Sequence, residues 1–285
     1  MFGMAGVILL VQVFALILAM PMKINEMRAF EDPTSTANSI YYIVIILVFT
    51  AILLLSIKKN MKWIIQVVIF LAVATTLYYV IYALLSVTEV APLTNNAISV
   101  LLAACMSILL HKFPEWYVID IIGLMVGAGA SAIFGISLAI IPTIVLLVLL
   151  ATYDAISVYK TKHMIALAEG VMDLKLPILF VIPKHLGYSF RKETFNTEGK
   201  REAFFMGLGD AVMPTILVVS ANVFIEHTGM ISYPALGAMI GTVVGFFALT
   251  ILVMKGKPQA GLPFLNSGVI IGYVAGCLLS CTSFF

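Results

Sequence analysis

The stretch ISLAIIPTIVLLVLLATYDAISVY, residues 136–159, is apolar almost throughout and carries one charged residue, Asp154. A helix of about 20 mostly apolar residues is long enough to cross the hydrocarbon core of a bilayer. The stretch is therefore predicted to form a transmembrane helix. An ionisable residue inside such a helix is costly to bury and usually serves a function, so Asp154 is the first residue to explain.

The rest of the chain has the same character. Hydrophobic residues make up 62% of it and charged residues 11%, against roughly 25% charged residues in soluble domains. The composition predicts an all-α, polytopic membrane protein with about nine transmembrane helices. The lipid bilayer is its expected surroundings, and a net charge of +2 without a basic, aromatic-rich run argues against a nucleic-acid partner. The predicted spans are residues 1–20, 39–57, 63–87, 97–110, 117–135, 136–159, 203–225, 234–254 and 261–281.

The loops differ sharply in positive charge. Of the 16 Lys and Arg residues, only Lys23 and Arg28 lie in odd-numbered loops, and all the others lie in even-numbered loops. Loops rich in Lys and Arg stay in the cytoplasm. The amino terminus is therefore predicted to be cytoplasmic and the carboxyl terminus external. This multi-pass protein is expected in the plasma membrane of a prokaryote, because its loops are short.

One long loop divides the predicted membrane domain. Residues 1–159 form a six-span bundle with Asp154, residues 160–202 a cytoplasmic loop, and residues 203–285 a three-span bundle with a second buried acid, Asp210. Within the loop, residues 163–172 are predicted to lie on the membrane interface as a helix and residues 191–201 are polar. Residues 176–183, LPILFVIP, are too short to span and are predicted to be extended between prolines.

Small residues recur at every fourth position in three predicted spans, which favours close helix crossings in lipid. They are Gly123, Gly127, Ser131 and Gly135, then Gly237, Gly241 and Gly245, then Gly268, Gly272, Gly276 and Ser280.

Asp154 and Asp210 are predicted to lie at matching depth. Asp154 comes shortly before Lys160, and Asp210 shortly after Glu202, on the two spans that the long loop joins. At 1.5 Å rise per residue, both would lie roughly 9–12 Å below the cytoplasmic surface. The other acids, Asp120 among them, fall in loops or near an interface.

No Lys, Arg or His lies at that depth to neutralise either acid. Two adjacent carboxyl groups share a proton, because both cannot ionise cheaply. Such a pair can act as general acid and general base. Two other interpretations stay open: simple hydrogen bonding of each Asp in a bundle core, and relay of charge by the pair in a proton- or cation-coupled transporter or channel.

The residues around Asp210 are unusual for a span. Gly207-Leu208-Gly209-Asp210 places two glycines beside the acid, and Pro214 follows four residues later. Proline cannot donate to the carbonyl four residues back, and glycine loosens a helix. The helix is therefore expected to kink or open at Asp210.

Tyr153-Asp154 together with Gly207-Leu208-Gly209-Asp210 resembles the signature of the GxGD intramembrane aspartyl proteases, the presenilin and signal peptide peptidase family. The resemblance implies a presenilin-like bundle in which Asp154 and Asp210 are catalytic. It also implies that Tyr153, Gly207, Leu208 and Gly209 belong to the substrate-binding motif. A cytoplasmic amino terminus favours the presenilin side of the family.

The family has a third element, Pro-Ala-Leu, at the cytoplasmic start of its last span. The literal string at residues 234–236 falls at the external start of the eighth predicted span, so it is interpreted as a coincidence. The segment that fits is residues 259–263, which has Gly261, Leu262 and Pro263, with glycine where the family has alanine.

The resemblance implies a protease that cuts transmembrane helices of other proteins, with neither metal nor organic cofactor. By the same resemblance, the 176–183 segment could gate the site; the alternative is a loop that rests its apolar side on the bundle. The transporter or channel remains the alternative function. Oligomeric state and accessory subunits are left open by the sequence.

Overall fold

The computed structural model describes residues 2–59, 61–88, 90–161, 179–185, 187–190, 202–254 and 259–282. The helices are α1 (Phe2–Ile24), α2 (Ala37–Lys58), α3 (Lys62–Ser86), α4 (Pro92–Lys112), α5 (Trp116–Ser137), α6 (Ile140–Ile156), the π-helical turn η1 (Ser157–Thr161), α8 (Leu208–Phe224), α9 (Tyr233–Val253) and α10 (Leu262–Ser280). The two strands are β1 (Leu179–Pro183) and β2 (Ala203–Gly207).

The prediction of a polytopic helical membrane protein is confirmed. Seven helices in the described part of the chain are long and apolar enough to cross a membrane, and the apolar stretches Ala37–Leu53 and Leu208–Phe224 are shorter. The seventh predicted span is wrong at its start, because residues 203–207 form a strand and the helix begins at Leu208. Hydropathy alone does not separate an apolar strand from the first turn of a helix.

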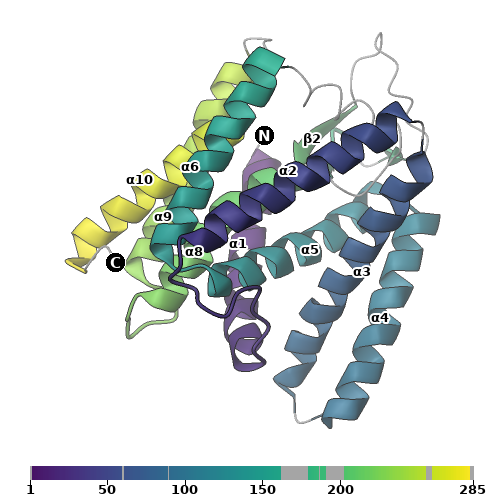
Figure 1. Cartoon of the computed structure of the whole chain (residues 1–285), viewed down its shortest axis with the longest axis horizontal. Coiled ribbons are helices and arrows are strands. Elements are labelled where there is room, and N and C mark those ends of the chain that lie inside the picture. Colours follow the sequence, from purple (N-terminus) through teal and green to yellow (C-terminus); the bar gives the residue numbers. More distant parts are fainter. Residues whose placement is uncertain are drawn as a thin grey trace.

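Three helices form the centre of the molecule, with a group of helices on either side. α1, α5 and α8 pack against one another, α3 and α4 pair on one side, and α6, α9 and α10 lie on the other (Figure 1). The largest hydrophobic cluster joins the central helices and includes small residues such as Ala15 on α1 and Ala128 and Ala132 on α5. Small side chains let helix backbones approach closely. Such close packing matters in lipid, because no hydrophobic effect drives helices together there.

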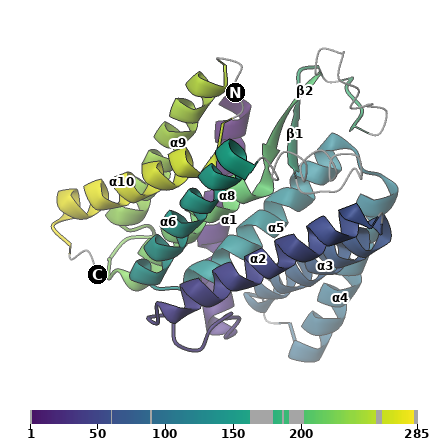
Figure 2. The ribbon, with the colours of Figure 1, turned by 45° about the horizontal axis from the view of Figure 1, so that its top comes forward.

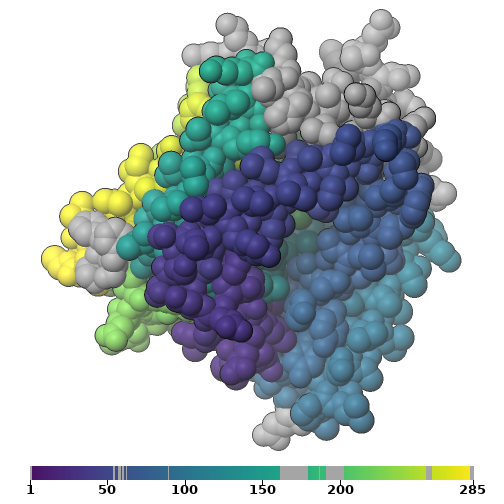
Figure 3. Space-filling view, in the orientation of Figure 1, coloured from purple at the N-terminus to yellow at the C-terminus, as the bar shows by residue number. Residues whose placement is uncertain are grey.

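α2 covers one face of this arrangement. It packs against α6 and α3 and lies as a band across the molecule (Figure 3).

α9 and α10 cross on the glycine faces that the spacing predicts. A Cβ atom added to Gly241 would lie 2.1 Å from the Gly268 carbonyl oxygen, and one added to Gly272 would lie 2.1 Å from the Gly237 carbonyl oxygen. Backbone meets backbone along this crossing. The same holds at the end near residue 262, where a Cβ atom on Gly245 would lie 2.5 Å from the Phe264 carbonyl oxygen.

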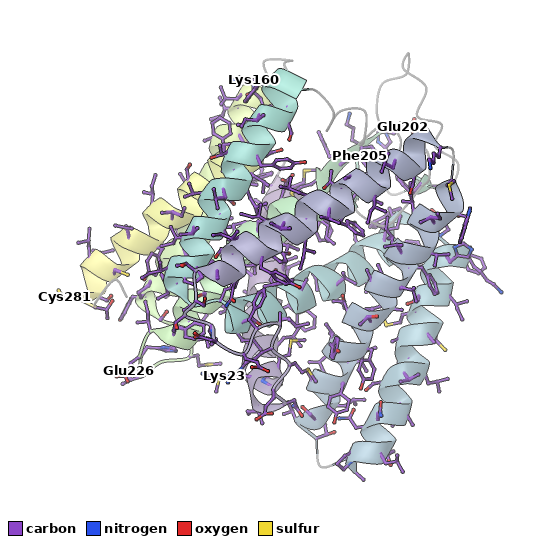
Figure 4. All side chains as sticks on the ribbon, in the orientation of Figure 1. Lys23, Lys160, Glu202, Phe205, Glu226 and Cys281 are labelled. Carbon is purple, nitrogen blue, oxygen red and sulfur yellow. The ribbon has the colours of Figure 1, made fainter. Side chains whose placement is uncertain are left out.

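The ends of the helices alternate between two sides of the molecule. Lys160 and Glu202, which flank the long loop, lie at one end, while Lys23 and Glu226 lie toward the other (Figure 4). The end with Lys160 and Glu202 is the one predicted to be cytoplasmic.

A two-stranded antiparallel sheet stands beside α5 and leads into α8 (Figure 2). Leu179 pairs with Gly207, Val181 with Phe205, and Pro183 with Ala203. The predicted extended segment is thus a strand over residues 179–183. Residues 176–178, the predicted interface helix at 163–172 and the polar segment at 191–201 lie outside the described residues.

Candidate active site

Asp154 is held on the last turn of α6. Its side chain is buried, with 6% of its surface exposed. Its Oδ2 atom accepts a hydrogen bond of 3.1 Å from the Leu262 N–H, and the Gly261 amide faces the same carboxyl group. Directly after α6 the chain winds into the π-helical turn η1, a geometry often found at functional sites.

Asp210 lies in the first turn of α8, where a strand becomes a helix. Gly207 has extended backbone angles (φ −60°, ψ 137°), and the helix starts at the next residue. The positive end of a helix dipole favours a carboxylate in this turn. The helix does not open at Asp210, since α8 runs unbroken from Leu208 to Phe224 with Pro214 inside it; a kink there stays a prediction. The irregular backbone comes instead just before the acid, at Gly207.

The two acids meet at the start of α10. A Cβ atom added to Gly261 would lie 3.1 Å from Asp210 Oδ1, and the adjacent Leu262 N–H donates to Asp154. Two carboxyl groups from different helices are therefore joined by one short segment, residues 261–262. This arrangement supplies the acid and the base that hydrolysis of an amide needs.

Comparison with known proteins agrees with this geometry. Residues 5–282 match the family described as signal-peptide peptidase, presenilin aspartyl protease. Two structures of a presenilin family intramembrane aspartate protease, in the C222 and P2 space groups, resemble the chain with TM-scores of 0.73. Each shares 39% sequence identity with it, over 98% of both chains. No curated protein gives a significant match.

The chain belongs to the signal-peptide peptidase and presenilin family. It is an intramembrane aspartyl protease, because the family is one of aspartyl proteases and the fold is a bundle of apolar, membrane-spanning helices.

The structure brings some of the motif residues of this protease to the acids and places others apart. The Leu262 N–H donates to Asp154. A Cβ atom added to Gly207 or to Gly261 would lie 3.4 Å or 3.1 Å, respectively, from a carboxyl oxygen of Asp210. Pro263 follows Leu262 in the first turn of α10. Residues 234–236 instead start α9, at the opposite end from the acids.

The remaining motif residues have different surroundings. Leu208 points onto α5, where its Cδ1 atom would lie 3.7 Å and 3.4 Å from Cβ atoms added to Gly123 and Gly127. Gly209 is exposed, with open space beside it. Tyr153 precedes Asp154 on α6 and is half-buried. In the described parts of the chain, no three His, Cys, Asp or Glu side chains gather where they could hold a metal ion.

Two residues of the presenilin-like site were missed in the sequence. The Tyr159 hydroxyl donates a hydrogen bond of 2.7 Å to Gln259 Oε1. The same hydroxyl oxygen accepts a hydrogen bond of 3.4 Å from the Ala260 N–H. Asn266 donates from Nδ2 to the Leu147 carbonyl at 2.9 Å. Both therefore tie the start of α10 to the helix that carries Asp154. A polar residue in an apolar span was the available signal for Asn266, whereas Tyr159 is aimed by the π-helical turn.

Tyr159→Phe should slow cleavage by about two- to tenfold, the worth of one or two ordinary hydrogen bonds. The ring would remain, but the hydroxyl that holds residues 259–260 would be lost. The effect is measured as kcat on a single-span peptide. Tyr117→Phe is the matched control, since that exposed ring lies at the start of α5. Equal rates in both variants would show that the Tyr159 hydroxyl does not hold the site.

Proposed function

We propose that Asp154 and Asp210 are the catalytic pair and that the enzyme cuts peptide bonds within transmembrane segments of other membrane proteins. The observation that carries the proposal is the convergence of both carboxyl groups on Gly261 and Leu262. No ordinary packing requirement brings two acids together in lipid, because each is costly to bury.

The chemistry follows from two carboxyl groups that share one proton. The ionised group takes a proton from water while the water oxygen bonds to the carbonyl carbon, and the protonated group donates to the carbonyl oxygen. The tetrahedral intermediate collapses when the carbon–nitrogen bond breaks and the leaving amine receives a proton. The Leu262 N–H keeps the Asp154 carboxyl group oriented. The pair works as a unit, so the proton is assigned to neither residue.

The substrate must lose its helix before it can be cut, because a helix hides its own carbonyl groups. The Lys184 N–H donates to the Glu202 carbonyl, so residues 184 and 202 form a hydrogen-bonded pair of the ladder. Alternation along the strands then turns the backbone groups of Ala203 and Gly207 away from β1. We propose that the unwound substrate adds as a strand along this edge of β2, which ends at Gly207 beside Asp210.

The predicted topology suits this reaction. Residues 1–159 and 203–285 each deliver one acid to the end of the bundle that the 160–202 loop joins. With the amino terminus in the cytoplasm of a prokaryotic cell and the carboxyl terminus outside, cleavage would occur near the cytoplasmic face of the plasma membrane.

The test is cleavage of a synthetic single-span peptide by the purified enzyme in detergent, with the cut located by mass spectrometry. We expect cuts inside the span and a rate unchanged by EDTA, because two carboxyl groups suffice for the reaction. The alternative, a transporter or channel, predicts proton flux into liposomes and no cut. Cleavage only outside the span, or a rate abolished by EDTA, would contradict the proposal.

A further inference from the structure

Asp120 has a contact that its sequence position does not suggest. It lies in the second turn of α5 and is half-buried, within an apolar helix. Its Oδ1 atom accepts a hydrogen bond of 2.7 Å from the Val181 N–H in the middle of β1. In the described part of the chain no Lys or Arg forms an ion pair with it, so a strand amide is what this acid binds. The dyad chemistry does not use Asp120.

The Asp120 bond lies on the outer edge of β1. Val181 and Phe205 are a non-hydrogen-bonded pair, since residues 184 and 202 are hydrogen-bonded and the pattern alternates. The Val181 N–H therefore points away from β2, toward α5. Pro183, the next residue with this orientation, has no N–H at all. Asp120 and Pro183 together leave positions 181 and 183 on this edge of β1 without a free N–H for another strand, so that only Leu179, at the start of β1, keeps an outward N–H.

α5 holds the hairpin at three further places. The Phe180 ring lies 3.2 Å from where a Gly123 Cβ would be, and Leu208 packs over both Gly123 and Gly127. Phe180 precedes Val181, and Leu208 follows the last residue of β2. The glycine face of α5 thus receives the open end of the hairpin, where β1 starts and β2 ends, while Asp120 binds the backbone in the middle of β1. Because β2 runs straight into the turn that carries Asp210, a shift of the hairpin moves the acid.

We propose that Asp120 is a positioning residue, which closes the outer edge of β1 and fixes the hairpin so that a substrate strand pairs with β2 in one register. The inference rests on the proposed function, in which the substrate adds to that edge. Register sets which peptide bond faces the dyad, because a one-residue slip turns every side chain to the other face. Asp120 therefore governs where the substrate is cut as well as how fast.

The test compares Asp120→Ala with Asp120→Asn. Asparagine keeps the acceptor oxygen and removes the charge, so it should cut at the wild-type position within about twofold of the wild-type rate. Alanine should lower kcat about tenfold, the upper end of the loss for one ordinary hydrogen bond, and should spread the cuts over neighbouring bonds. Glu115→Ala is the matched control, because Glu115 stands at the N-cap position of α5 and its carboxylate accepts a hydrogen bond from the Ser189 hydroxyl rather than from a strand amide.

Val181→Pro tests the same bond from the donor side. The Val181 N–H is outside the β1–β2 ladder, and proline is tolerated at such edge positions. Its cut positions should match those of Asp120→Ala, and the double variant should be no worse than either alone, because the two changes remove one interaction. This variant also serves if Asp120→Ala does not fold.

Hydrogen exchange gives a readout without activity. The peptide that covers residues 179–183 should exchange faster in Asp120→Ala than in wild type, Asp120→Asn or Glu115→Ala. The proposal is overturned if Asp120→Ala leaves both hydrogen exchange and the cut positions unchanged. It is also overturned if Asp120→Asn is as impaired as Asp120→Ala, because the role would then belong to the charge and not to the hydrogen bond. Failure of the proposed function looks different: the wild type would not cut within the span, whatever residue 120 does to exchange.

Discussion

Asp154→Asn and Asp210→Asn should each lower cleavage of a single-span peptide by about a thousandfold, within the usual range for loss of a general acid or base. Asparagine has nearly the shape of aspartate, so the bond from the Leu262 N–H to residue 154 can persist. The amide can neither take a proton from water nor share one with its partner. Because the two acids act as a unit, the double variant should be no slower than either single variant.

The readout is the initial rate with the purified variants in detergent, beside their thermal unfolding temperatures. Asp32→Asn is the matched control: it makes the same chemical change in the loop between α1 and α2, where the carboxylate accepts bonds from the Thr34 N–H and hydroxyl. It should cut like wild type. A folded Asp154→Asn or Asp210→Asn variant with more than about a tenth of the wild-type rate would remove that residue from the catalytic pair.

Much of this site can be predicted from the sequence, because the bilayer allows few backbone structures and few charged residues. Apolar runs must form helices, since no water is present to hydrogen-bond their backbone groups. Two acids in such runs are conspicuous because placing a charged group in lipid has a high free-energy cost. The bias of Lys and Arg between loops predicts which ends lie together, which puts Asp154 and Asp210 at one depth. The structure accordingly joins the two acids through residues 261–262.

The features that the sequence did not predict depend on distant partners. AFFMG, residues 203–207, is as apolar as a helix, and it is a strand only because residues 179–183 pair with it. The sequence places Asp120 among the acids near the interface, because nothing local shows that a strand amide far along the chain will reach it. Tyr159 is turned toward Gln259 by a π-helical turn that has no simple sequence signal.

Gly241→Ala and Gly245→Ala should lower stability and activity although alanine is the better helix former. In an open helix the change stabilises by roughly 1 kcal/mol. Here the new methyl group would lie 2.1 Å from the Gly268 carbonyl oxygen, or 2.5 Å from that of Phe264. Since backbone cannot rotate away as a side chain can, α9 and α10 must separate, and overpacking of this kind costs about 1–3 kcal/mol. Thermal unfolding in detergent measures the loss.

Gly6→Ala on α1 is the control for helix propensity, since the added methyl group would meet no atom of another element within 4 Å. It should leave stability unchanged or slightly higher. If Gly241→Ala behaves in the same way, the close crossing of α9 and α10 does not contribute to stability.

The loss of activity should depend on which glycine is changed. Gly245 faces Phe264, two residues from the Leu262 N–H that holds Asp154, whereas Gly237 meets Gly272 and Gly276 farther along α10. A displacement of about 1 Å at a catalytic group can slow a reaction about a hundredfold. We therefore expect about a hundredfold loss for Gly245→Ala and progressively smaller losses for Gly241→Ala and Gly237→Ala, at similar losses of stability. Equal losses at all three positions would mean that the crossing only supports the fold, and that the start of α10 is positioned by Tyr159 and Asn266 instead.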